Sequence, residues 1–340
     1  MAGASRAWLR ALALAAGAAG VGCVVSPAMA QADGAAGAAA PATGNDTLSD
    51  RATFLLSPER WHDDSEIGWE GFLSGLRGFE HFYNPVGQPL YFETPFNNTG
   101  VRFLFLHHTF SDDSQLAGGE VNVVALQARV ALTERLGFIA TKDGYSWLNA
   151  GALPEDEGWN EIAAGLKYAF YVDRENDFVA TAGARITLDS GESKIAMFGT
   201  TEVSPFISVA KGWDRFHVIG SATYRIPFDE DDGNQVFMWD LHADYEIVPE
   251  SVPGLAPVVE LHGVHYTSDG TRLPFSVGGL DYANFGSADV SGSSVVWAGF
   301  GARWKLSPHV SVGGVYEIGL TDHDADIMQD RVTFDVEVIW

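Results

Sequence analysis

The sequence contains little cysteine, few basic residues and few long apolar runs. Its one cysteine, Cys23, stands among 340 residues, so no disulfide can form within the chain. Lys and Arg together number 20 against 45 Asp and Glu, which gives a net charge of -25. This acidic balance argues against duplex nucleic acid as a partner, because such binding depends on basic side chains that neutralise phosphates. The lack of repeated apolar runs of about 20 residues excludes a bundle of transmembrane helices.

What the sequence does contain favours β-structure. Hydrophobic residues make up 46% of the chain, which excludes a protein that is mostly disordered. The 38 glycines and the 12% of aromatic residues fit strands joined by many turns. The length accommodates one large domain or two ordinary ones, so composition leaves the domain count and the function open.

The first 30 residues have the pattern of an export signal. Two arginines precede an apolar run over residues 11–25. The small residues Ala28 and Ala30 then provide the A-x-A pattern of a signal-peptidase site. We therefore expect residues 1–30 to be a signal peptide, removed after Ala30 during export through the periplasm.

Two alternatives for this segment would leave it attached to a membrane. A retained anchor is disfavoured because Pro27 ends the apolar run at signal-peptide length. A lipoprotein would use Cys23 as its acceptor, but the Leu-like residue expected three positions earlier is absent. Cleavage also removes Cys23, so the mature chain would contain no cysteine. Residues 31–50 are rich in Ala, Gly, Pro and Thr without periodicity, which predicts a flexible linker.

Polar and apolar residues alternate along most of the remaining chain. In residues 331–340 the even positions are apolar and the odd ones mostly polar, which is the period of a strand with two different faces. No helical periodicity intervenes, which argues against a parallel βαβ architecture. We predict about twelve strands, over residues 100–111, 120–132, 136–143, 160–172, 178–188, 204–212, 215–227, 236–247, 257–267, 293–306, 309–321 and 331–340.

Short and long connections alternate between these strands. The connections over residues 133–135, 173–176, 212–214, 248–256 and 307–308 are the shorter ones, and those between them are longer and more acidic. A meander with tight turns at one end and long loops at the other produces this alternation. Outer-membrane barrels have this arrangement, and soluble up-and-down barrels share it.

Two features favour an outer-membrane barrel with its apolar face towards lipid. The polar faces carry Gly, Ser, Thr and isolated charges rather than the Lys/Glu mixture of a solvated surface. Aromatic residues gather at strand ends, as in the girdles at both membrane interfaces. Because a bilayer forbids open sheet edges, the strands must close. We predict an all-β transmembrane antiparallel barrel over residues 99–340, located in the outer membrane and in contact with its lipids and lipopolysaccharide.

The end of the chain resembles the signal that the bacterial barrel-assembly machinery reads. It consists of Phe334, Val336, Val338 and the terminal Trp340, where the usual last residue is Phe. Residues 159–168 resemble a strand of the porin-like family annotated with the MetA pathway of phenol degradation. The resemblance to outer-membrane β-barrel proteins implies a role in solute passage or at the surface. It implies the assembly machinery as a partner, no catalytic residue and no cofactor.

If the apolar faces point to lipid, the opposite faces line a lumen through which small solutes or ions could diffuse. Basic groups favour one half of this wall and acidic groups the other, which would set a transverse field across a water-filled pore. A twelve-stranded barrel is intermediate in width, so a lumen filled by ion pairs is the alternative. The predicted lining residues are Arg129, Lys167, Arg185, His217, Arg225, Asp240, His242, Asp244, Glu246, Glu260, His262, Arg303, Lys305, Glu317, Arg331, Asp335 and Glu337.

Residues 51–98 precede the first strand and follow a different pattern. Apolar residues recur at helix-like intervals between Trp69 and Phe82, while three glycines among them weaken a helix. We predict an amphipathic segment that lies at the periplasmic mouth or partly plugs the barrel. The alternative is a short extension that packs under the barrel.

No catalytic residue or metal site is predicted. The acids at residues 112–113 and 322–324 could activate a water on the rim, as in omptin-type surface proteases, but their spacing and the predicted strand number match that pattern poorly, which favours a solvated anionic loop. The acidic turn at residues 229–234 suits Ca²⁺ but lacks the EF-hand spacing. His107 and His108 are adjacent on a strand and point to opposite faces. A diffusion channel is the favoured function class, with a structural or adhesive surface protein and a rim-acid hydrolase as alternatives.

Overall fold

The structure is a computed structural model that describes residues 71–192, 200–247, 251–321 and 326–340. These residues form thirteen strands and no helix. None of them forms a helix long and apolar enough to cross a membrane. The strands are β1 (Gly100–Phe110), β2 (Gly119–Ala131), β3 (Leu136–Ala150), β4 (Asp156–Trp159), β5 (Ile162–Asp173), β6 (Phe178–Leu188), β7 (Glu202–Trp213), β8 (Phe216–Pro227), β9 (Val236–Tyr245), β10 (Leu255–Tyr266), β11 (Ser294–Lys305), β12 (Val310–Gly319) and β13 (Met328–Ile339).

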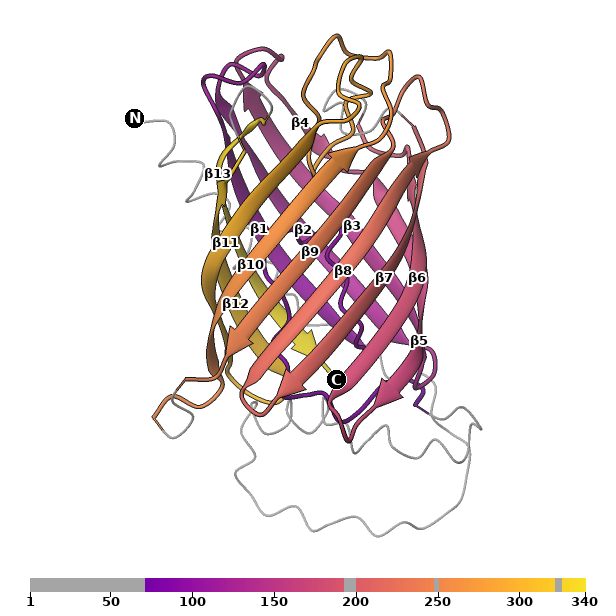
Figure 1. The fold of residues 1–340 in the computed structure, drawn as a ribbon, viewed down its shortest axis with the longest axis vertical. Coiled ribbons are helices and arrows are strands. Elements are labelled where there is room, and N and C mark those ends of the chain that lie inside the picture. The colour runs from indigo at the N-terminus through magenta and orange to yellow at the C-terminus, as the bar shows by residue number, and fades with distance from the viewer. Residues whose placement is uncertain (1–70, 193–199, 248–250, 322–325) are drawn as a thin grey trace, which may run out of the picture. The chain divides into compact units, whose positions relative to one another are not determined.

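Twelve of these strands close into one antiparallel barrel. Each pairs with its neighbour in the chain, β1 pairs with β13, and β2 pairs with β3, so that no edge remains open (Figure 1). The short β4 pairs only with β3, at the rim. The predicted up-and-down barrel of twelve strands is therefore confirmed.

The largest difference between the predicted and the observed strand ends is in β3. The sequence predicts its end at residue 143 and a loop up to residue 159, but the strand continues to Ala150 and β4 follows. The backbone of Tyr145 pairs with β2 on one side and with β4 on the other, which extends the sheet above the barrel. Sequence alternation missed this extension because polar and glycine residues interrupt it.

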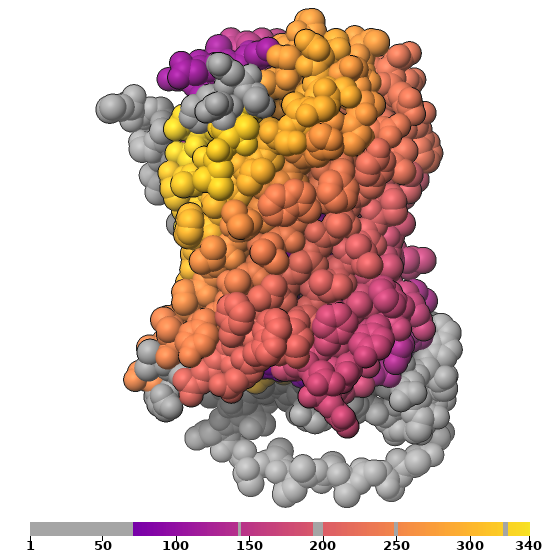
Figure 2. Space-filling view, viewed as in Figure 1, coloured from indigo at the N-terminus to yellow at the C-terminus, as the bar shows by residue number. Residues whose placement is uncertain are grey.

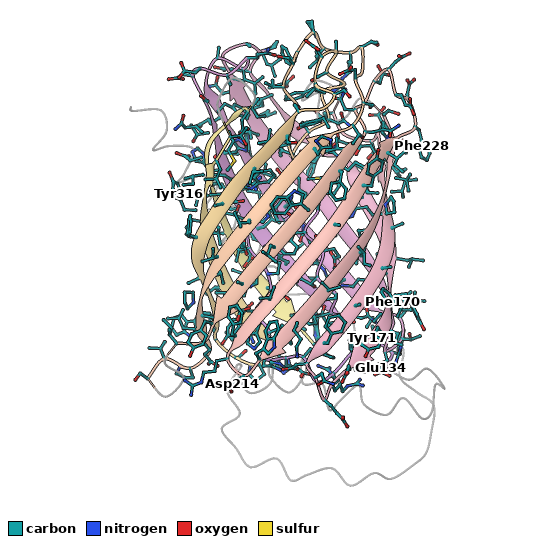
Figure 3. All side chains as sticks on the ribbon, viewed as in Figure 1. Glu134, Phe170, Tyr171, Asp214, Phe228 and Tyr316 are labelled. Atoms are coloured by element: carbon teal, nitrogen blue, oxygen red, sulfur yellow. The ribbon has the colours of Figure 1, made fainter. Side chains whose placement is uncertain are left out.

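The outer surface of the barrel is apolar. Large side chains such as Leu166, Ile207 and Phe334 leave 50%, 46% and 52% of their surface exposed, which is the reverse of a soluble protein. Phe170 and Tyr171 point outward near one end of the barrel, and aromatic rings also point outward towards the other end (Figure 3). Such a surface is stable only against lipid, so the chain is a transmembrane barrel.

The connections divide the barrel into a short-turn end and a long-loop end. The turn between β7 and β8 consists of two residues, whereas residues 267–293 connect β10 to β11 at the opposite end (Figure 1). On the face shown in Figure 2, side chains cover the wall continuously. Outer-membrane barrels have short turns on the periplasmic side, and the chain's last residue lies at the short-turn end.

The predicted helical pattern before β1 does not form a helix. Residues 71–98 contain only turns, bends and extended chain. Gly71, Gly75 and Gly78 have φ angles of 75°, 67° and 99°, outside the right-handed helical region. The glycines therefore determine the backbone conformation here, and the helix-like spacing of the apolar residues does not.

Several predictions concern residues outside the described part of the chain. These are the signal peptide with its cleavage after Ala30, the linker over residues 31–50, the first part of the extension up to residue 70, and the acids at residues 322–324. They stay predictions.

Candidate functional site

The structure places most of the predicted lining residues on the inner wall of the barrel. They alternate with lipid-facing residues along each strand, and their side chains are buried although they are ionisable. The buried members are Arg129, Lys167, Arg185, His217, Arg225, Asp240, His242, Asp244, Glu260, His262, Arg303, Glu317, Arg331, Asp335 and Glu337. So much buried charge is tolerated only where each group has partners.

Two predicted lining residues lie at the short-turn mouth instead of deep in the lumen. Glu246 follows the last residue of β9 and accepts a hydrogen bond from the Gly254 amide at 3.0 Å, so it belongs to the turn and not to the wall. The sequence predicts a longer strand here because its alternation continues past Tyr245. Lys305 ends β11 and is half-buried.

A re-entrant segment of the chain fills the lower part of the lumen. We call residues 76–97 the plug. Its two ends meet at the short-turn end, where the Leu76 amide donates to the Asn97 carbonyl at 2.6 Å. Its apex reaches Leu90 and Tyr91, which pack in the apolar cluster of the upper lumen. The plug therefore enters and leaves through the same mouth.

Basic side chains of the wall donate to the plug's backbone carbonyls. Lys167 Nζ lies 3.0 Å from the Thr94 carbonyl and 2.6 Å from that of Phe96. Arg185 donates to the Leu90 carbonyl, and to that of Tyr91 at 3.3 Å. Further donors to the plug backbone are Arg102 to Val86, Gln127 to Pro89, Thr181 to Pro95, Arg303 to Asn84 and Pro85, and Lys305 to Glu80 and His81.

One plug side chain makes a buried ionic contact with the wall. Glu93 Oε1 and Oε2 accept from Nε and Nη2 of Arg129 at 3.0 and 2.8 Å, and Lys167 Nζ lies 2.8 Å from Oε1. Burial alone would raise the pKa of Glu93, but the two adjacent cations outweigh it and lower that pKa below its usual range. Glu93 is therefore a carboxylate wherever the plug is seated near neutral pH.

The acidic half of the wall binds the plug through its amides. Glu260 accepts from the Val86 amide at 2.8 Å and from the Gly87 amide at 2.6 Å. A Cβ on Gly87 would lie 2.4 Å from Glu260 Oε2, so only glycine permits this approach. Wall carboxylates thus bind the plug through its amides, as wall cations bind it through its carbonyls.

Histidines and carboxylates form a connected chain along β8, β9 and β10. His242 bridges Asp244 at 3.2 Å and Glu260 at 2.8 Å, and His217 reaches Asp244 at 2.7 Å. His262 lies 2.9 Å from Asp240. This chain fixes the orientation of Glu260, and through it the docking point of the plug.

A second segment fills the lumen from the long-loop end. We call residues 267–293 the cap loop. Its Asp281 accepts from Arg331 at 2.8 Å, and its Leu280 carbonyl accepts from Arg225 at 3.0 Å. Leu280 packs in one buried apolar cluster with the plug residues Leu90 and Tyr91. The plug and the cap loop thus meet, and together they occupy the lumen.

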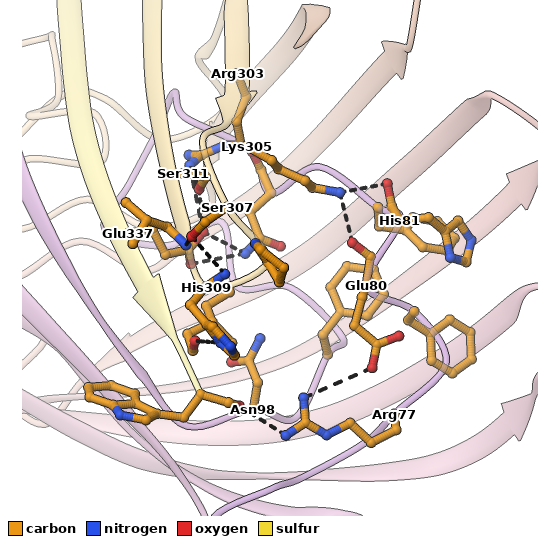
Figure 4. A pocket seen from close by; sticks show the side chains of 18 of the residues that line it. Arg77, Glu80, His81, Asn98, Arg303, Lys305, Ser307, His309, Ser311 and Glu337 are labelled. Carbon is orange, nitrogen blue, oxygen red and sulfur yellow. Dashed lines mark hydrogen bonds and ion pairs between the residues drawn. The ribbon is translucent and has the colours of Figure 1, made fainter. Parts of the chain in front are cut away.

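A pocket of about 680 Å³ opens at the short-turn mouth, between the plug and the ends of β11, β12 and β13 (Figure 4). Lys305 crosses it to the carbonyls of Glu80 and His81, at 2.8 Å each. Arg77 donates to the Trp340 carbonyl at 3.2 Å. The pocket is a vestibule whose inner wall is the plug.

Sequence reasoning missed four charged residues of the site. Glu93 and Asp281 lie outside strands, where alternation gives no face. Glu202 begins β7, two residues before the predicted start, and pairs with Arg225 at 3.1 Å. Arg102 lies on β1, whose two faces are both largely apolar, so the sequence does not show whether its side chain points to the lumen or to the lipid.

Most of the residues considered for other chemistry lie outside the lumen. Asp113 is exposed on the loop after β1, and Asp229 caps its own turn by accepting from the Asp231 amide at 3.0 Å. His107 contacts Asn122 at 2.8 Å, while His108 is buried on the opposite, inner face. The described residues include no group of three or more His, Cys, Asp or Glu side chains arranged to hold a metal ion.

Comparison with known proteins gives a likeness of fold. No protein-family model and no curated protein matches the chain. An outer membrane channel from Pseudomonas putida F1 superposes with a TM-score of 0.53 at 11% identity, over 76% of this chain and 100% of that one. The NanC porin gives 0.44 at 10% identity, over 71% and 98%, a likeness too weak to support an argument.

The first likeness agrees with what the strands and the apolar exterior establish independently. The chain has the fold of an outer-membrane β-barrel, as the sequence predicts, and this fold supports the predicted outer-membrane location. The resemblance of residues 159–168 to the phenol-degradation family stays a prediction.

Proposed function

We propose that the protein is a gated outer-membrane channel, in which small solutes or ions diffuse through the charged lumen when the plug leaves it. One observation carries the proposal: side chains of the wall hold the plug through hydrogen bonds to its backbone groups, and the plug pairs with none of the barrel strands that the structure describes. Such a segment can withdraw without breaking the sheet. The lumen that it vacates is lined by charged groups on both halves.

The plug apex supports this account because it is imperfectly seated. Gln88 is fully buried with a φ of 44°, and its side-chain nitrogen and oxygen have no hydrogen-bond partner among the described residues. Each such group costs about 1–3 kcal/mol. The seated plug is thus less stable than its many contacts suggest, as a displaceable segment requires.

The filled lumen also favours a second candidate, a structural or surface barrel that conducts nothing. Recording from purified protein in planar bilayers separates the two. The channel gives discrete conductance steps, and the structural barrel gives none at any salt concentration or voltage. The rim acids supply no observation for a hydrolase, and we propose that the protein lacks catalytic activity.

Gly87→Ala tests the role of the plug. The added methyl group would lie 2.4 Å from Glu260 Oε2 and 2.9 Å from Glu317 Oε1, so the apex must shift. We expect a higher open probability than in the wild type. Gly220→Ala is the matched control, since its methyl group would meet nothing closer than 3.5 Å. Equal open probabilities in all three proteins would contradict gating by the plug.

We further propose that the barrel-assembly machinery reads Phe334, Val336, Val338 and Trp340. Phe334 and Val336 face the lipid side, 52% and 43% exposed, where an assembly factor can reach them. The apolar exterior supports contact with outer-membrane lipids, and contact of the long-loop end with lipopolysaccharide is part of the same proposal.

A further inference from the structure

The cations of the inner wall fall into two groups according to where their carboxylate partners lie. Arg225 pairs with Glu202, Arg331 with Glu317, and Arg303 with Asp335, all within the barrel wall. In the described structure, Arg129 and Lys167 on β2 and β5 have only the plug residue Glu93 as an ion-pair partner. Their charge balance therefore depends on the plug.

Arg185 on β6 extends this second group. No described carboxylate lies within ion-pair distance of it, and its hydrogen bonds go to plug carbonyls and to Thr141 at 3.2 Å. When the plug withdraws, β2, β5 and β6 present three cations to the lumen without a wall carboxylate beside them. Once water enters the vacated lumen, the field of these three cations attracts a dissolved anion to the place that Glu93 leaves.

The geometry around Glu93 specifies the kind of anion. Arg129 donates two nearly parallel bonds to the two carboxylate oxygens, and Lys167 adds a third from the side. This fork matches a planar carboxylate.

We propose that Arg129 and Lys167 form a carboxylate-binding site in the solute path, that Glu93 occupies this site in the closed state, and that the transported solutes are small organic carboxylates. The inference rests on the proposed channel function and names its solute class. Glu93 acts as a tethered competitor, so solute binding and plug seating exclude each other at this point.

The binding test uses the full chain with Glu93→Ala. This substitution removes a fragment equivalent to acetate, so sodium acetate at constant ionic strength should raise the thermal unfolding midpoint of the variant, and acetamide should not. Adding Arg129→Gln should weaken the apparent acetate affinity at least about tenfold. Arg102→Gln is the matched control, because Arg102 has a wall partner in Asp335 at 2.6 Å. The proposed site would be overturned if acetate raised the unfolding midpoint equally in Glu93→Ala and in Glu93→Ala with Arg129→Gln. Migration as folded protein on unheated gels establishes that both variants are folded.

The transport test compares liposome swelling with succinate and with neutral succinamide. Wild-type protein should admit succinate faster, and Lys167→Gln should lose this preference. Equal rates for both solutes in the wild type would overturn the solute class and leave the channel intact. Permeation of neither would overturn the proposed function, and the inference with it.

Discussion

Glu260→Gln should release the plug. The carboxylate accepts two plug amides, from Val86 and Gly87, with one oxygen for each. A glutamine offers one oxygen and one NH₂ group, so at least one plug amide then faces a donor. A lost charge-assisted hydrogen bond costs about 1.5–3 kcal/mol, which raises the population of the withdrawn plug by roughly 10- to 100-fold.

Cysteine accessibility measures this population directly. The chain's one cysteine is Cys23, so replacing it by serine gives a clean background. A cysteine introduced at Leu90, which is 7% exposed at the plug apex, reacts with a water-soluble maleimide only when the plug leaves. The labelling rate should rise by the same factor in Glu260→Gln. Glu120→Gln, whose described contacts stay on the wall, is the control. An unchanged rate in Glu260→Gln would refute the assignment of Glu260 as the docking point.

Three further predictions follow from the same contacts. Gln88→Met removes two unpartnered polar atoms at a buried position, so it should stabilise the seated plug by about 1–3 kcal/mol and slow the Leu90 labelling; faster labelling would contradict this. Asp281→Asn weakens the contact of the cap loop with Arg331, 2.8 Å away, so single-channel recording should show more frequent opening; unchanged gating would limit the gate to the plug. Leu241→Arg places a charge on the lipid face and should destabilise the barrel by about 2–4 kcal/mol in denaturant unfolding from lipid vesicles, whereas Leu241→Met should not; a tolerated arginine would argue against a lipid-facing position.

The barrel could be predicted from sequence because its strands obey a period of two. In β9, Asp240, His242 and Asp244 alternate with lipid-facing residues, so both the strand and the direction of its charges follow from the pattern. The same holds for Arg331 and Asp335 on β13. Local alternation is sufficient to predict a strand and the direction of its side chains wherever one face contacts lipid and the other face lines a polar lumen.

The filling of the lumen could not be predicted in this way. The plug lacks the strand period of two, and its contacts join it to strands far away in the chain, as with Glu93 and Lys167. These contacts use backbone groups that every residue carries, so no residue type marks them. Gly87 is a signal only after Glu260 is known to lie against it. The cap loop presents the same difficulty, since Asp281 is one acid among many in the long connections.

A disulfide lock on the plug tests the central claim most directly. A Cβ on Gly313 would lie 2.7 Å from Cγ2 of Val86, where a cysteine sulfur would stand, so Val86→Cys with Gly313→Cys places two thiols within bridging reach of each other. In a background without Cys23, bilayer recording should show no conductance under oxidising conditions and discrete openings after reduction. Equal conductance in the oxidised and reduced states would show that solutes do not pass through the space the plug occupies.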